Sequence, residues 1–167
     1  GFAVFAAGLA YNWIPYRQAP LPEVTSDMGT ISPKLKYIKA DKPTFDRFME
    51  LKGLVAKYGP NYIVTTNYPG AHYLFNTHNP LPADWMINSE YSFRLREMVA
   101  IASKSGAYIF LEKNYNPTFD KERLKYKNYS YFSQYIKDHG KPVEILPNFT
   151  VYNSRDLYDA LPQAAAH

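Results

Sequence analysis

The segment from residue 68 to residue 90 gathers most of the side chains that could bind a polar ligand or act on one. It follows residues 62–66, a β-branched and aromatic run typical of a buried strand, and the turn residues Asn67-Tyr68-Pro69-Gly70 end that run. Open α/β sheets hold their ligands beyond the carboxyl ends of strands. We therefore predict a ligand-binding site in this segment, formed by Tyr68, His72, Tyr73, His78, Asn79, Asp84, Trp85 and Glu90.

Asp84 and Glu90 are the only carboxylates of this segment. General acid–base catalysis uses two carboxylates whose environments differ, and Trp85 and Tyr73 would give a sugar ring a stacking surface. In the competing interpretation Asp84 is a turn residue and Glu90 lies in the first turn of a helix. We favour this second interpretation, because the spacing of the two carboxylates alone does not indicate catalysis.

A metal site and a nucleotide site both lack support in the sequence. His72, His78 and Asp84 offer nitrogen and oxygen ligands, but their spacing of six matches no compact metal-binding motif. We expect the imidazoles to hydrogen-bond the loop backbone instead. Neither a glycine-rich phosphate loop nor a GxSxG elbow is present, so we expect no metal and no cofactor.

Length and composition indicate a folded protein with many surface aromatics. The chain has 167 residues, of which 46% are hydrophobic and 20% charged, enough for one domain with a core. Its 16 Tyr and 10 Phe suit contacts with sugars, proteins or a membrane headgroup region. The net charge of +4 is mild and dispersed, and KERLKYK at residues 121–127 is typical of a solvated helix face, so we expect no nucleic-acid partner.

The amino-terminal residues predict a membrane anchor. Residues 1–16 carry no charged side chain and include Trp13 and Tyr16, which suit the boundary between lipid and water. The run is shorter than the roughly 20 apolar residues that cross a bilayer, so we interpret it as the end of a transmembrane helix. Residues 17–33, which contain Pro20 and Pro22, read as a connector, residues 34–162 as a single α/β domain, and residues 163–167 as an appended tail.

Helical and strand-like patterns alternate through that domain. We expect strands at residues 35–40, 62–66, 107–111, 143–146 and 149–152, and helices at residues 42–58, 90–105, 119–139 and from 154 onward. This alternation predicts an α/β fold with a mainly parallel sheet and helices on both faces, preceded by the apolar amino-terminal segment.

Four stretches of the sequence carry a resemblance to a known family: Asp27-Met28-Gly29, SPKLKYIKADKPTFDRF, LVAKYGPNYIVTTNYPGAHYLF and NPLPADWMINSEY. Together they resemble the extracytoplasmic carboxy-terminal region of GT-C-type membrane glycosyltransferases, the class that includes the family 39 protein mannosyltransferase-like enzymes. The strongest parts are YPGAHY at residues 68–73 and NPLPADW at residues 79–85.

The resemblance implies a non-catalytic role. Enzymes of that class take sugar from a polyprenyl-phosphate donor with acidic residues in loops that this sequence does not contain, so no catalytic residue carries over. The chain would be a membrane-anchored domain on the extracytoplasmic side that covers the active site or recognises a glycan or a polyprenyl-phosphate sugar. Its partners would include membrane lipid or the remaining transmembrane portion of the parent protein.

Two alternatives from other classes stay open. In the first, the chain is a structural protein whose apolar amino terminus and Tyr-rich surface make subunit contacts. In the second, it is a carbohydrate-acting hydrolase that uses Asp84, Glu90 and His72.

Overall fold

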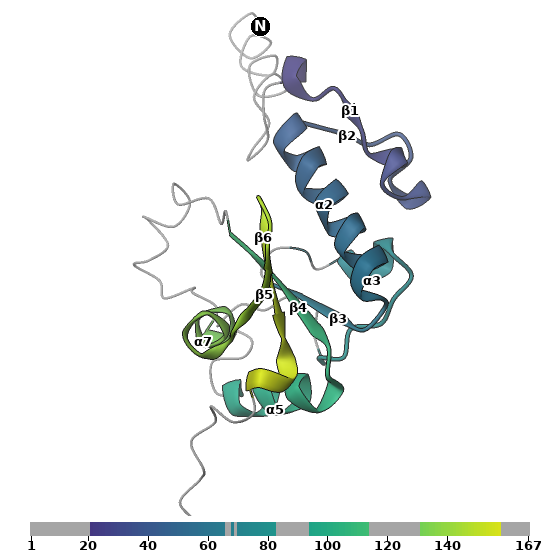
Figure 1. The fold of residues 1–167 in the computed structure, drawn as a ribbon. Coiled ribbons are helices and arrows are strands. Elements are labelled where there is room, and N and C mark those ends of the chain that lie inside the picture. Colours follow the sequence, from purple (N-terminus) through teal and green to yellow (C-terminus); the bar gives the residue numbers. More distant parts are fainter. Residues whose placement is uncertain (1–20, 66–67, 69, 83–93, 114–130, 158–167) are drawn as a thin grey trace, which may run out of the picture. The chain divides into compact units, whose positions relative to one another are not determined.

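The computed structural model of the chain describes residues 21–65, 68, 70–82, 94–113 and 131–157 (Figure 1). The chain divides into two compact units, residues 1–52 and 53–167, and the boundary falls inside helix α2 (Lys42–Tyr58). The apolar segment predicted at residues 1–16 lies outside the described residues. None of the described helices combines the length and the apolar character that crossing a bilayer requires.

The first unit is built on a small antiparallel sheet. Strand β1 (Ser26–Asp27) pairs with β2 (Lys39–Ala40), and short 3-10 helices occupy Leu21–Glu23, Met28–Thr30 and Pro33–Leu35. The predicted strand at residues 35–40 is therefore reduced to its last two residues. Its first part forms a turn because Ser32 accepts a hydrogen bond from the Lys34 backbone N–H at 3.4 Å and Pro33 suits the first helical position.

Helix α2 matches the prediction from sequence at both ends. At its start, the Asp41 side chain accepts a hydrogen bond from the Thr44 backbone N–H at 3.0 Å and satisfies a donor that the helix itself leaves without a partner. At its end, Gly59 adopts a φ of 82°, which only glycine reaches without strain, and Pro60 follows.

The second unit contains a four-stranded mixed sheet, and the prediction of a mainly parallel sheet is wrong. Strands β3 (Tyr62–Thr65), β4 (Tyr108–Glu112), β6 (Phe149–Asn153) and β5 (Pro142–Ile145) lie side by side in that order. Only β3 and β4 pair in parallel, whereas β6 runs antiparallel to both β4 and β5.

Connection length explains this difference. The segment between β3 and β4 is long enough for the crossover that a parallel pair requires, and it includes helix α5 (Leu95–Ser105). Only residues 146–148 separate β5 from β6, so these two strands form a hairpin, closed by the Leu146 N–H donating to the Phe149 carbonyl at 2.9 Å. Strand β6 then inserts between β4 and β5 and reverses the local direction of the sheet.

The hydrophobic core of the second unit lies between one face of this sheet and the helices α5 and α7 (Tyr131–His139). The sheet supplies Ile63, Ile109 and Leu111, whose side chains share a face because alternate residues of paired strands do. The helices supply buried apolar residues, Met98, Val99, Ala102, Phe132 and Ile136. Each large side chain buried in this way contributes roughly 1.5–3 kcal/mol, so this cluster is the main support of the unit.

Candidate functional site

The opposite face of the β3–β4 pair carries aromatic side chains that support the loop after β3. The Tyr62 ring stacks on Phe110, with 5.2 Å between ring centroids, and also on the His72 ring of helix α3 (Ala71–Leu74), at 4.4 Å and 14°. Tyr62 and Phe110 are fully buried, and His72 is 6% exposed. Helix α3 is therefore fixed to the sheet by a stack of rings.

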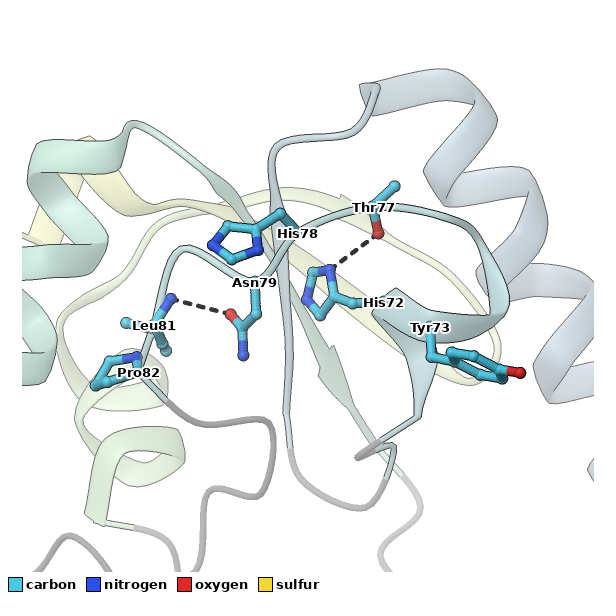
Figure 2. A pocket seen from close by; sticks show the side chains of 7 residues that line it. All are labelled: His72, Tyr73, Thr77, His78, Asn79, Leu81 and Pro82. Carbon is cyan, nitrogen blue, oxygen red and sulfur yellow. Dashed lines mark hydrogen bonds between the residues drawn. The ribbon is translucent and has the colours of Figure 1, made fainter.

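The chain then turns back on α3 and closes the loop. Asn76 adopts a φ of 53°, a left-handed conformation that asparagine tolerates better than most residues. The reversal brings the Thr77 N–H within 2.9 Å of the His72 carbonyl. The Thr77 hydroxyl lies 2.9 Å from His72 Nδ1 (Figure 2). It also lies 2.7 Å from the Tyr62 hydroxyl, so one side chain connects the loop to both rings.

A second small turn follows at Asn79. Its side-chain oxygen accepts a hydrogen bond from the Leu81 N–H at 3.1 Å, in the way asparagine commonly stabilises a turn (Figure 2). Leu81 is buried in the core cluster and anchors this end of the loop.

The residues of the two turns line a pocket of about 330 Å³ that is open to solvent. Imidazole, hydroxyl and amide groups line it together with an apolar wall; the lining residues are His72, Tyr73, Thr77, His78, Asn79, Leu81 and Pro82. His78 is exposed and makes no hydrogen bond with any described residue, so its ring nitrogens can serve a ligand. Tyr73 is also exposed, and its ring points away from His78 and Asn79 (Figure 2).

Tyr68 belongs to a different group of residues, at the carboxyl ends of the two parallel strands. Its hydroxyl donates to Glu112 Oε1 at 3.2 Å, and its ring lies 5.7 Å from the ring of Phe149. Glu112 is buried at the end of β4. The prediction from sequence does not include Glu112. Glu112 lies at the carboxyl end of a strand, where open α/β sheets hold ligands, and the same rule is the reason for predicting Tyr68.

The structure describes five of the eight predicted site residues and places them at two locations. His72, Tyr73, His78 and Asn79 line one pocket, and Tyr68 lies against Glu112. Asp84, Trp85 and Glu90 lie outside the described residues. Thr77 was not predicted, because a single hydroxyl in a polar loop gives no distinctive signal in the sequence.

The described side chains of the pocket can make hydrogen bonds and apolar contacts. Its described polar groups donate and accept hydrogen bonds, and Leu81 and Pro82 offer apolar contact to the faces of a ring. In the parts of the chain that the structure describes, no three His, Asp or Glu side chains gather in a way that could hold a metal ion.

Comparison with known proteins identifies no relative. No protein-family model, no curated protein and no solved structure matches the chain. The functional assignment therefore depends on the pocket and on the sequence.

Proposed function

We propose that the chain is a non-catalytic recognition domain that binds a glycan, or the sugar of a polyprenyl-phosphate donor, in the pocket between His72 and Pro82. The wider role follows from the sequence resemblance: the domain serves a membrane glycosyltransferase-like protein on its extracytoplasmic side, close to the active site. Residues 1–16 hold it at the membrane.

The observation that supports this proposal most strongly is the combination of an open, polar pocket with a loop that hydrogen bonds close. A volume of about 330 Å³ is at the small end of ligand pockets and suits one or two sugar rings. A sugar presents many hydroxyl groups and an apolar ring face, which match His78, Asn79 and the wall formed by Leu81. Because the Thr77 hydrogen bonds hold the loop in place, little ordering cost opposes binding.

The position of His72 favours recognition over hydrolysis. A general acid or base must reach the substrate within hydrogen-bond distance. His72 is instead 6% exposed, stacked on Tyr62 and hydrogen-bonded through Nδ1 to Thr77. Its role in the described structure is to support the pocket floor.

The test is a calorimetric titration of the chain with methyl glycosides of mannose, glucose and N-acetylglucosamine, and with mannosyl phosphate. We expect at least one of these probes to bind, and His78→Ala to weaken that binding about tenfold, the value of one good hydrogen bond to a ligand. The matched control is His139→Ala, which removes another exposed imidazole, on α7. The proposal fails if none of the probes binds, or if His78→Ala and His139→Ala bind as well as the unmodified chain.

Assembly is the second candidate function, and the edge strand β5 favours it. Val143 and Ile145 are 50% and 67% exposed there, at one end of the strand order in the described sheet. A second copy of the chain would cover them. Sedimentation velocity over a hundredfold range of concentration tests this: assembly requires larger particles at high concentration that Ile145→Lys abolishes, and a constant monomer excludes it.

A further inference from the structure

The turn at residues 34–39 of the first unit, here called the lysine–tyrosine turn, exposes large apolar side chains among lysines. Its sequence is Lys34-Leu35-Lys36-Tyr37-Ile38-Lys39, and Tyr37 and Ile38 are 87% and 50% exposed. It connects the 3-10 helix Pro33–Leu35 to strand β2. Nothing in the proposed function of the pocket uses this turn.

The backbone of the turn suits glycine better than tyrosine. The Ile38 N–H donates to the Leu35 carbonyl at 3.0 Å, which closes a four-residue turn. Lys36 has φ −53° and ψ 134°, and Tyr37 has φ 72°, the values of a type II turn, whose third position normally holds glycine. A bulky residue at positive φ is strained, and such strain persists where the side chain serves a function.

The base of the turn is held firmly, so its tip has a defined position. The Met28 N–H donates to the Ile38 carbonyl at 2.9 Å, and Ser26 and Asp27 of β1 pair with β2. Met28 is itself buried, at 3% exposure. The exposed Tyr37 and Ile38 are thus presented by an ordered support.

The charged residues within the turn are all positive. Residues 28–40 contain three lysines and no acidic residue. The flanking carboxylates are occupied by the backbone: Asp27 accepts from the Gly29 N–H at 2.9 Å and Asp41 from the Thr44 N–H at 3.0 Å. The Lys36 ammonium lies 4.8 Å from the centroid of the Tyr37 ring, so cation and aromatic face solvent together.

We propose that the lysine–tyrosine turn binds the surface of an anionic lipid bilayer. Tyr37 and Ile38 enter the interface between headgroups and acyl chains, where an amphipathic aromatic ring and an aliphatic side chain are both favoured. Lys34, Lys36 and Lys39 contact the lipid phosphates, and each lysine near an anionic surface strengthens binding about fivefold. This inference stands apart from the pocket, which belongs to the other compact unit.

A bilayer accounts for the turn better than a protein partner does. A protein interface concentrates aromatic residues and depletes lysine, whereas a membrane contact combines interfacial aromatics with several lysines. The projecting tip, with exposed side chains at residues 36–39, also suits shallow insertion into a soft surface.

The experiment uses the absence of cysteine from the chain, which makes any introduced cysteine unique. A nitroxide label is attached to Ile38→Cys in the full chain, and, as a matched control, to Ile145→Cys, an exposed isoleucine of the second unit. Electron paramagnetic resonance then measures the accessibility of each label to oxygen and to a water-soluble nickel chelate. The vesicles are equimolar phosphatidylglycerol and phosphatidylcholine, or phosphatidylcholine alone.

With anionic vesicles we expect the label at residue 38 to gain oxygen contact and lose nickel contact, while the label at residue 145 stays in water. Replacing Lys34, Lys36 and Lys39 by glutamine should lower the ratio of immersed to free label at residue 38 about 100-fold. Tyr37→Gly should lower that ratio about tenfold while the denaturation midpoint stays equal or rises, because glycine relieves the strained φ. His78→Ala, which tests the pocket, should leave the label spectra unchanged.

Three results would overturn the proposal. The label at residue 38 could remain in water on anionic vesicles, or be immersed equally in the glutamine variant. Alternatively, soluble poly-glutamate could bind the turn while the label at residue 38 shows no immersion on vesicles. That result would assign the turn to an acidic protein partner. None of these results bears on glycoside binding, so failure here is distinguishable from failure of the pocket.

Discussion

Thr77 is the residue on which the geometry of the pocket depends most. Its hydroxyl is within hydrogen-bond distance of both the Tyr62 hydroxyl and His72 Nδ1, at 2.7 and 2.9 Å. No feature of the sequence distinguishes Thr77 from other loop hydroxyls. The prediction from sequence includes His72 and His78, because imidazoles in a proline-broken loop suggest a binding site. The structure separates the two: His72 is buried and His78 is exposed.

We predict that Thr77→Val, which keeps the side-chain shape but removes the hydroxyl, lowers the free energy of unfolding by about 1–3 kcal/mol. The reason is that two buried polar groups each lose one hydrogen bond. Urea denaturation followed by circular dichroism measures the change, and glycoside affinity should fall with it. Thr25→Val, at an exposed position, is the control and should stay within about 0.5 kcal/mol of the unmodified chain. Equal stability of the two variants would show that the bridge does not hold the loop.

Glu144 provides a second prediction at this scale, because two partners stabilise its charged form. Its carboxylate accepts hydrogen bonds from Lys57 Nζ at 2.7 Å and from the Tyr58 hydroxyl at 2.6 Å. The hydrogen bond from Lys57, followed by that from Tyr58, lowers the Glu144 pKa below its ordinary value of 4.5. The hydrogen bond to Glu144 raises the Lys57 pKa above 10.5.

The pH dependence follows from these directions. Since the folded pKa of Glu144 is the lower one, its contribution to stability is present above about pH 4.5 and is lost as the pH falls through the folded pKa. The contribution of Lys57 is present below pH 10.5 and is lost as the pH rises further. Because Lys57 is exposed, we expect a small effect that salt screens.

The measurement compares denaturation midpoints of the unmodified chain and Glu144→Gln. The unmodified chain should be the more stable at pH 7 and at pH 5, and the difference should shrink toward pH 3. Glu23→Gln, at an exposed carboxylate of the first unit, should show no such convergence. A difference that stays constant from pH 7 to pH 3 would contradict the ionic origin of the interaction.

At the scale of elements, the sequence predicts which segments form helices and strands better than how they pair. Helix α2 agrees with the prediction because Pro43 near its start and Gly59-Pro60 after its end are strong local signals. Strands β3, β4 and β6 agree within one or two residues because apolar runs between turn residues are equally local. Pairing direction depends on connection length, and the three residues before Phe149 require a hairpin that the alternation rule overlooked.

Two glycines give a prediction at this scale. A methyl group at Gly140, directly after α7, would lie 2.6 Å from the Ile136 carbonyl oxygen and 2.7 Å from Tyr152 Cδ1. Backbone and a buried ring cannot move aside easily, so Gly140→Ala should lower stability by about 1–3 kcal/mol. A methyl group at Gly53, in the interior of α2, meets nothing within 4 Å, so Gly53→Ala should raise stability by about 1 kcal/mol.

Thermal or urea denaturation of the two alanine variants measures both effects in one experiment. Opposite shifts of the midpoint are expected, although the substitution is chemically the same. Midpoint shifts of the same sign would contradict the close contacts at Gly140 or the open space at Gly53.

At the scale of the whole molecule, two compact units carry two kinds of surface: the pocket in residues 53–167 and the lysine–tyrosine turn in residues 1–52. The sequence prediction and the pocket share His72, Tyr73, His78 and Asn79, because a polar, proline-broken loop after a strand is where both the composition and the chain reversal occur. The prediction did not separate Tyr68 from the pocket, since the partner of Tyr68, Glu112, comes from a strand 44 residues later. Contacts of that range arise only from the pairing of β3 with β4, which local patterns do not specify.

The most direct test of the central claim is a nuclear magnetic resonance titration of the isotope-labelled chain with the methyl glycosides and mannosyl phosphate. The recognition account predicts that a bound probe shifts the backbone amide signals of residues 72–82, with the largest changes at Thr77, His78 and Asn79. His78→Ala should reduce these shifts, and His139→Ala should not. Saturable binding that shifts signals elsewhere and leaves residues 72–82 unchanged would contradict the account.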